Sequence, residues 1–272
     1  MRRLAVFARF VLCLIAFSQL LSGCGSVPLT GRKQVLLVSD QEVLEAGLTQ
    51  YNEYMAEASL STNAKASAMV SSVGKKLAAS TEKYLKSNGL ESEIANLAWE
   101  FSLVKNNEVN AFCLPGGKIV VYEGLLSVAQ TEAELAVVIG HEIGHAVAKH
   151  SNERLSQQIM TEYGMAILSQ ALSQKSAAVQ TAATSVFGLG AQVGLMLPYS
   201  RKHEYEADYM GIVFMEIAGY DSSSAIDFWT KMSAGGGNTN DFLSTHPSDS
   251  KRIAEITRRI PEAKSIGNSM RK

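Results

Sequence analysis

Residues 131–150 read TEAELAVVIGHEIGHAVAKH, and the predicted architecture is organised around this segment. Thr131 and Glu134 have the spacing of a capping box, so we expect a helix to begin here and to run through His150. The segment is mostly apolar before and between its polar positions, which favours a helix packed into the core over one that lies on the surface.

The second half of this helix carries the motif His-Glu-x-x-His at residues 141–145. His141 and His145 are four residues apart, so they share a helix face and both imidazoles can reach one metal ion. Zinc accepts imidazole and carboxylate ligands and keeps a fourth position open when the protein supplies three. The motif predicts a catalytic zinc site with Glu142 as general base. The competing interpretation is a surface helix with two solvated histidines.

A third protein ligand is predicted in the segment SRKHEYEAD, residues 200–208. Ser200 can cap a helix that contains Glu204 and Asp208, four residues apart on one face. Glu204 is the candidate ligand, and Asp208 can accept a hydrogen bond from a ligand histidine and so fix its tautomer. Glu206 is the local competitor, and a solvated acidic face is the alternative for the whole segment.

Outside these two segments the sequence predicts a mainly helical α+β fold. Helices are expected at about 39–58, 64–80 and 248–260, in addition to the helix that Ser200 caps and that carries residues 204–217. A small antiparallel sheet beside the zinc-binding helix is expected from three apolar runs and a hairpin turn: Trp99–Leu103, Val109–Leu114, Lys118–Tyr122 and the turn at Pro115–Gly117. Residues 176–197 carry no charge, and we favour a buried core helix there over a segment that enters the membrane.

The N-terminal segment has the composition of a bacterial export signal. Residues 1–23 contain three arginines and no acid, followed by an apolar run that is too short to span a bilayer comfortably. They end in a sequence similar to the lipoprotein cleavage box, Leu21-Ser22-Gly23-Cys24, which predicts Cys24 as a lipidated first residue. We then expect a lipidated tether at 24–38, a zinc domain at 39–262 and a C-terminal tail at 263–272.

The composition excludes one class of partner and leaves several residues open. The 272 residues include 25 basic and 26 acidic side chains, which argues against binding to nucleic acid. His246 precedes the last helix; it can stabilise an oxyanion, occupy the fourth position on zinc and keep the site latent, or be structural. We expect His203 at the surface or as an orienter of a ligand, and His150 at the end of its helix, where it interacts with the helix C-terminus. Arg201 can contact substrate or pair with an acid, Tyr205 can donate to an oxyanion or pack in the core, and Cys113 is expected in the core.

Taken together, the motifs resemble the HtpX/Oma-type zinc metallopeptidases, which form metallopeptidase family 48 among the gluzincins. His-Glu-x-x-His followed by Glu-x-x-x-Asp is similar to the gluzincin pattern, and Ser-Arg-x-x-Glu-x-x-Ala-Asp resembles this family in particular. The likeness covers about residues 27–262. It extends to four further segments in the family's order: Asn110-Ala111-Phe112, Pro115-Gly116-Gly117, Tyr122-Glu123-Gly124-Leu125 and Thr245-His246-Pro247.

The resemblance implies a zincin-like fold and a set of residue roles. Those roles are ligation of one Zn²⁺ by His141, His145 and Glu204, general base for Glu142, support of a ligand by Asp208, and an edge strand at Asn110 and Ala111 that binds extended substrate. Several family members carry transmembrane helices around this domain, whereas the present sequence is expected to use the lipid on Cys24.

The combined expectation is a zinc-dependent endopeptidase of the bacterial cell envelope that degrades unfolded, misfolded or stalled envelope proteins. Gly25 after the lipidated cysteine favours the periplasmic face of the outer membrane in a Gram-negative cell. Two alternatives stay open. One is a chaperone-like outer-membrane assembly factor with a latent or rarely used zinc site, and the other is a lipoprotein with a structural zinc. The sequence makes no prediction about the oligomeric state.

Overall fold

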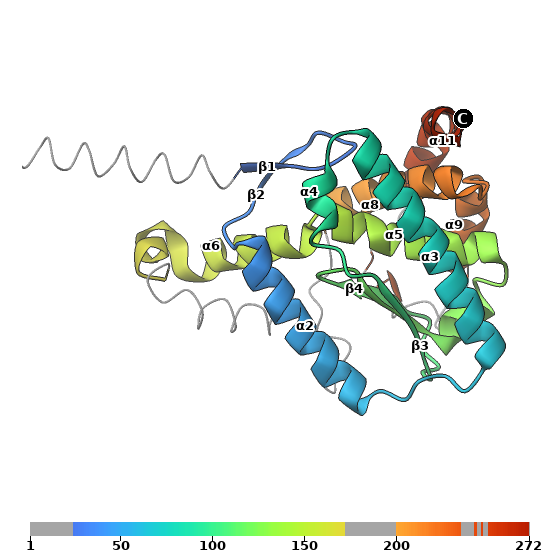
Figure 1. Ribbon diagram of the computed structural model, residues 1–272, viewed down its shortest axis with the longest axis horizontal. Helices are drawn as coiled ribbons and strands as arrows, with labels where there is room; N and C mark the ends of the chain where they lie inside the picture. The colour runs from blue at the N-terminus through green and yellow to red at the C-terminus, as the bar shows by residue number, and fades with distance from the viewer. Residues whose placement is uncertain (1–23, 172–199, 235–241, 244–245, 247–249, 272) are drawn as a thin grey trace, which may run out of the picture.

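A computed structural model describes residues 24–171, 200–234, 242–243, 246 and 250–271 (Figure 1). The predicted export signal at 1–23, the predicted core helix at 176–197 and the glycine loop at 235–237 lie outside the described residues. The helices are α2 (Asp40–Glu57), α3 (Ala64–Ser87), α4 (Glu91–Ile94), the 3-10 helix η1 (Glu123–Ser127), α5 (Glu132–Val147), α6 (His150–Ala171), α8 (Arg201–Ala218), α9 (Ser224–Ala234) and α11 (Ser250–Arg271). The strands are β1 (Cys24–Ser26), β2 (Lys33–Val35), β3 (Glu100–Val104), β4 (Ala111–Leu114) and β5 (Lys118–Tyr122).

The centre of the fold is the pair of helices α5 and α8, whose backbones approach each other closely. A Cβ added to Gly140 would lie 3.2 Å from the carbonyl oxygen of Gly211, and one added to Gly144 would lie 2.6 Å from that of Ala207. Glycine at these positions therefore permits a close approach that a side chain would prevent. The approach brings the predicted ligands of both helices into one place.

The sheet formed by β3, β4 and β5 is covered on both faces. Ile119 and Val121 of β5 belong to the core built with α3, α5 and α8, whereas Val120 and Tyr122 belong to a second core with α2 and α6. This alternation follows from the two-residue period of a strand. Figure 1 shows α3 and α5 on one side of these strands and α2 on the other. The predicted mainly helical α+β fold is confirmed.

The strand pairing differs from the expected antiparallel sheet in one respect. The hairpin of β4 and β5 around Pro115–Gly117 is antiparallel as predicted, with Phe112 opposite Val120. Strand β3, however, pairs parallel to β5, with Ser102 opposite Val120, so the order is β3-β5-β4 and the sheet is mixed. Residues 105–110 carry the chain across the central strand to the far edge, a crossover that alternation within each strand does not reveal.

The predicted helix 131–150 is interrupted near its end. Helix α5 stops at Val147, and Lys149 adopts a left-handed backbone with φ of 55°, after which α6 begins at His150. Ion pairs of 2.7 Å from Lys149 Nζ to Asp40 and to Glu93 hold this conformation. His150 therefore begins a helix, and the expected interaction with a helix C-terminus is wrong.

The last helix is longer than predicted. Helix α11 continues through Pro261 to Arg271, so the residues assigned to a tail at 263–272 are helical as far as Arg271. Ala263 is fully buried and Ile266 packs on the core. A Cβ on Gly267 would lie 2.5 Å from Glu216 Cβ of α8. Burial against α8 extends the helix past a proline that would otherwise favour its end.

The predicted tether at 24–38 is also folded onto the domain. Strands β1 and β2 form an antiparallel hairpin that pairs Cys24 with Val35. Val27 is 1% exposed and belongs to the main core. The backbone N–H of Leu37 donates to Ser156 Oγ of α6 at 2.8 Å. Within the described ranges, no helix is both long enough and apolar enough to cross a bilayer.

Candidate metal centre

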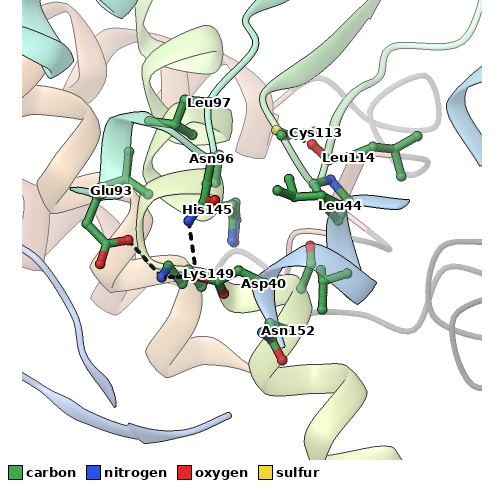
Figure 2. A pocket seen from close by; sticks show the side chains of 16 residues that line it. Asp40, Leu44, Glu93, Asn96, Leu97, Cys113, Leu114, His145, Lys149 and Asn152 are labelled. Carbon is green, nitrogen blue, oxygen red and sulfur yellow. Dashed lines mark hydrogen bonds and ion pairs between the residues drawn. The ribbon is translucent and has the colours of Figure 1, made fainter. Parts of the chain in front are cut away.

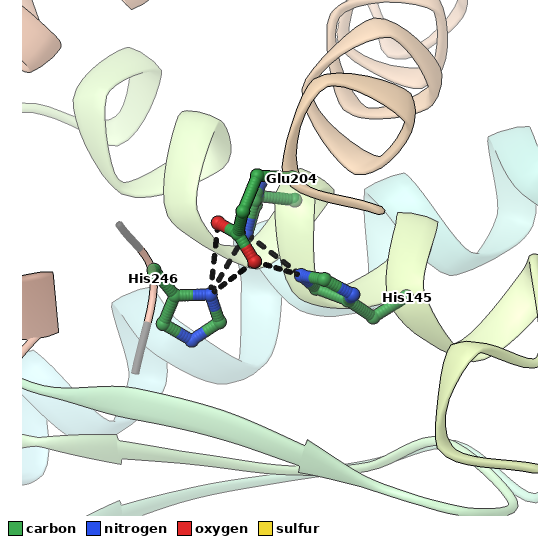
Figure 3. Close-up of side chains that lie close together, drawn as sticks. His145, Glu204 and His246 are labelled. Carbon is green, nitrogen blue, oxygen red and sulfur yellow. Dashed lines mark hydrogen bonds and ion pairs between the residues drawn. The ribbon is translucent and has the colours of Figure 1, made fainter. Parts of the chain in front are cut away.

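Three predicted ligands meet between α5 and α8. His141 Nε2 and His145 Nε2 are 2.9 Å apart, and the Glu204 carboxylate lies 3.3 Å from the first and 3.4 Å from the second. His246 joins them from the segment before α11, with Nδ1 3.1 Å from His141 Nε2 and 3.2 Å from Glu204 Oε2. Figure 3 shows His145, Glu204 and His246 pointing toward one another. All four side chains are buried.

The donor set fits zinc. Bonds of about 2.1 Å in a tetrahedron separate ligand atoms by about 3.4 Å, close to the separations seen here. Because His141 and His145 each direct Nδ1 at another partner, their Nε2 lone pairs face each other and a carboxylate. Such an arrangement needs a cation between the lone pairs. Burial lowers the pKa of His141, but Glu204 and Asp208 outweigh it and raise that pKa to about 9. The two carboxylates therefore favour a positive charge at His141, which a metal ion supplies in place of the proton.

Glu142 lies beside these ligands as the motif predicts. It is 1% exposed, and burial raises its pKa above the ordinary value, although His246 and His141 oppose the shift. Its Oε1 has no hydrogen-bond partner within the described ranges, and His246 Nε2 approaches it at 3.4 Å. A buried carboxylate oxygen without a donor is available to accept a proton from a bound water.

His141 is supported by what we call the Asp208 network, formed by His141, Asp208 and Arg252. Asp208 Oδ1 accepts from His141 Nδ1 at 2.8 Å, and Arg252 donates twice to the same carboxylate, at 2.6 and 2.8 Å. Burial raises the pKa of Asp208, but Arg252 and His141 reverse that effect and lower it. The guanidinium of Arg252 also lies 3.1 Å from Glu204 Oε2 and 3.4 Å above the ring of Trp229.

His145 is supported by a second set, the Glu206 network, formed by His145, His150, Glu206 and Arg32. His145 Nδ1 lies 2.8 Å from His150 Nδ1, and His150 Nε2 lies 3.0 Å from Glu206 Oε2. Glu206 is thus turned away from the ligand cluster, which resolves its competition with Glu204. Burial lowers the pKa of His150 to about 4, so the ring is neutral at pH 7.

The other residues that the sequence left open differ in burial. His203 is buried, so the expected surface position is wrong, and its Nε2 donates to Glu153 Oε2 at 3.1 Å. Cys113 is a buried core residue as predicted, and burial raises the pKa of its thiol well above the ordinary value. Arg201 is exposed and Tyr205 is half-buried on α8.

The predicted substrate strand is an edge of the sheet. Strand β4 pairs only with β5 among the described strands, and Asn110 directly precedes it. Asn110 Oδ1 accepts from the backbone N–H of Ala111 at 2.9 Å, while the Asn110 carbonyl accepts from Tyr122 N–H at 3.1 Å. The structure thus places both residues at an edge, and their contact with substrate stays a prediction.

A pocket opens beside His145, on the side of α2 (Figure 2). Its volume is about 50 Å³, room for one or two water molecules. Lys149 forms its ion pairs with Asp40 and Glu93 at this pocket. Apolar side chains of α2, α5, the β4 hairpin and the segment between α4 and β3 provide much of the remaining lining: Val43, Leu44, Leu97, Leu114, Pro115 and Val147.

Sequence reasoning missed three residues of the two networks. Arg252 is one of several basic residues on an amphipathic helix, and no spacing distinguishes it from its neighbours. Arg32 lies in a segment interpreted as a tether. His150 was visible as a histidine near the motif, but its role depends on the chain reversal at Lys149. A basic residue that is 0% exposed, such as Arg252, is recognisable only from the fold.

The fold and site define a zincin-type metallopeptidase domain with a His-Glu-x-x-His helix and a glutamate ligand on a second helix. Residues 71–260 match Peptidase family M48, and the chain belongs to that family. The resemblance to metallopeptidase family 48 is thereby confirmed. The expected zinc cofactor is confirmed with it, because the family uses zinc and this chain holds a buried cluster of metal-ligating side chains.

Curated relatives agree with this assignment. The mitochondrial metalloendopeptidase OMA1 of Arabidopsis thaliana is 41% identical over 174 residues, which cover 64% of this chain and 34% of the relative. The human metalloendopeptidase OMA1 is 28% identical over 247 residues, 88% of this chain and 46% of the relative. The beta-barrel assembly-enhancing protease of Yersinia pestis is 29% identical over 173 residues, 61% of this chain and 35% of the relative. The chain therefore matches about a third to a half of the length of these relatives.

Proposed function

We propose that this chain is a zinc-dependent endopeptidase. The observation that carries the proposal is the buried Oε1 of Glu142, which accepts no hydrogen bond from the described residues and lies beside a buried set of two histidines and a glutamate. A purely structural zinc site has no use for such a carboxylate. Zinc held by His141, His145 and Glu204 supplies a Lewis acid that activates water and polarises a carbonyl.

The residues of the chain then perform the proton transfers. Glu142 accepts a proton from the attacking water and delivers it to the leaving amine, because its raised pKa suits both acceptance and release. The edge of β4 that pairs with no described strand offers backbone groups to an extended peptide, so that the scissile bond lies against the ligand cluster.

The test is cleavage of casein by soluble residues 25–272 in the presence of zinc, with Glu142→Gln in parallel. We expect cleavage by the wild type and a loss of at least about 1,000-fold in the variant, since a glutamine cannot accept the proton. Both proteins should bind zinc with similar affinity. Equal cleavage by both would assign the activity to a contaminating protease. A variant that retains its cellular role would favour the chaperone-like alternative.

We further propose a location at the bacterial cell envelope, with a lipid on Cys24 and unfolded or misfolded envelope proteins as substrates. The arginine-rich start, the short apolar run and the small residues before Cys24 support this location. Metabolic labelling with a palmitate analogue tests it. Wild-type protein should incorporate the label and sediment with membranes, whereas Cys24→Ser should do neither. Labelling of the variant would contradict the assignment.

A further inference from the structure

The N-terminal hairpin is tied to the domain through two carboxylates. Arg32 Nε donates to Glu206 Oε2 at 2.6 Å, and its two terminal nitrogens donate to Glu153 at 2.9 and 2.7 Å. Thr30 Oγ1 donates to the other oxygen of Glu206. Glu206 and Glu153 are 7% and 8% exposed. Arg32 therefore supplies the charge that lets two buried carboxylates lie near each other.

From Glu206 the contacts lead to a metal ligand. A carboxylate can only accept, so His150 Nε2 must carry the proton that it shares with Glu206 Oε2 at 3.0 Å. In a neutral ring this leaves His150 Nδ1 as an acceptor for His145 Nδ1–H at 2.8 Å. His145 Nε2 is then left with its lone pair, directed at the ligand cluster. One carboxylate thus fixes the tautomers of two histidines in sequence.

We infer that Arg32 is a positioning residue of the metal centre: by holding Glu206 in place it fixes His150, and through His150 the tautomer and orientation of the zinc ligand His145. The hairpin β1–β2 is therefore a functional part of the zinc site. This goes beyond the proposed function, which gives the hairpin no role beyond carrying a lipid.

The contact is more than an ordinary surface ion pair. An exposed pair contributes little, because water screens it and both side chains lose entropy. Here the Arg32 side chain is 12% exposed and all three of its guanidinium nitrogens are bonded to carboxylates. His203 donates to Glu153 from the other side, and its ring stacks on that of His150 at 4.3 Å. The carboxylates and both rings form one packed group that Arg32 completes.

The experiment measures zinc affinity by competition with a chromophoric chelator, using the full chain purified in detergent. We expect Arg32→Ala to weaken zinc binding at least about tenfold, the usual effect of losing a residue that supports a ligand. Lys33→Ala is the matched control, because it removes the same charge from the adjacent residue of the hairpin at an exposed position. The control should keep wild-type affinity. Wild-type affinity in Arg32→Ala would overturn the inference.

A double-mutant cycle separates positioning from simple attachment of the hairpin. Glu206→Gln should weaken zinc binding, and Arg32→Ala should add little to that loss, because both act through the same contact. Losses that multiply would contradict the inference. The absorption spectrum of the Co²⁺-substituted protein should change in both single variants and stay constant in Lys33→Ala.

A milder variant covers the case in which Arg32→Ala does not fold. Arg32→Lys keeps the positive charge but lacks the planar fork that contacts both carboxylates. It should weaken zinc binding severalfold. An unchanged affinity in Arg32→Lys, together with an unchanged Co²⁺ spectrum, would show that the geometry of Arg32 does not reach His145 and would overturn the inference.

Discussion

The two histidine ligands lie one helical turn apart, but they are supported in opposite ways. His141 is held by the Asp208 network, in which Asp208 is 4% exposed and Arg252 is completely buried. His145 is held by the Glu206 network, which passes through His150 and Glu206 and reaches the half-buried Arg32 on the N-terminal hairpin. One support is enclosed by the core, and the other extends from the core to the periphery.

Because of this difference, the two networks should affect different properties of the protein, namely folding stability and the geometry of the metal site. The charges of the Asp208 network have no access to water, so removing one partner leaves another charge buried and unpaired. The outer end of the Glu206 network is close to solvent, and water can replace part of what Arg32 supplies. We therefore expect changes in the first network to affect folding strongly, and changes at the outer end of the second to affect mainly the metal site.

The largest expected effect is that of Arg252→Met. The change leaves Asp208 and Glu204 buried without their cation, so the free energy of unfolding of the metal-free protein should fall by about 3–5 kcal/mol. Arg32→Met should cost clearly less, because its side chain is 12% exposed. Urea unfolding at pH 7 measures both. Equal losses would remove the distinction between the two networks.

The next effect concerns zinc affinity. Asp208→Asn keeps the shape of the side chain but removes the charge that His141 and Arg252 contact, so zinc binding should weaken about 10- to 100-fold. The Asp208 and Glu206 networks share no residue, so Asp208→Asn and Glu206→Gln together should multiply their separate losses. Chelator competition on the four proteins checks this. A double variant no weaker than Asp208→Asn alone would show that the two networks act as one.

A change at His246 should have a smaller effect, and it should increase activity instead of weakening the protein or its metal site. Its ring lies within the ligand cluster, it stacks on Phe242 at 4.5 Å, and its carbonyl accepts from Arg252 at 3.3 Å. A histidine in this position occupies the place of a fourth ligand, so His246→Ala should raise basal casein cleavage severalfold. Reduced cleavage would instead assign His246 to support of the transition state.

The smallest expected effect is the contribution of Glu153, the second carboxylate that Arg32 contacts, to the pH dependence of folding stability. Burial raises the pKa of Glu153, but hydrogen bonds from His203 and Arg32 outweigh it and hold the pKa at about 2. Because the folded pKa lies below the ordinary value of 4.5, this contribution to stability is complete above pH 4.5 and is lost as the pH falls toward 2. Urea unfolding measures the free energy of unfolding at pH 6 and at pH 3.5, and the decrease between the two should be smaller in Glu153→Gln than in wild type. An equal decrease in both proteins would show that ionised Glu153 does not contribute to stability.

The parts of the fold that could be predicted from sequence are those with local causes. Ser39, Thr131 and Ser200 cap helices that begin where their side chains predict. The spacing of four residues in His141–His145 and in Glu204–Asp208 places each pair on one helix face. These signals act within a single turn, so they are readable without knowledge of the rest of the chain.

The parts that could not be predicted depend on distant contacts. The break at Lys149 is held by Asp40 and Glu93, and the extension of α11 depends on burial against α8. The same holds for the site. Arg252 and Arg32 are separated by 44 and 174 residues from the carboxylates Asp208 and Glu206 that they hold, and nothing in their neighbours marks them.

The close crossing of α5 and α8 has a consequence for the motif itself. Gly144 occupies a position that the pattern His-Glu-x-x-His leaves free, yet a Cβ there would meet the Ala207 backbone at 2.6 Å. A larger residue would push α8 outward and carry Glu204 and Asp208 with it. In this chain the motif therefore specifies a distance between two helices as well as a ligand set. A saturation scan of residues 141–145 should find Gly144 as intolerant as the histidines, although glycine touches no metal.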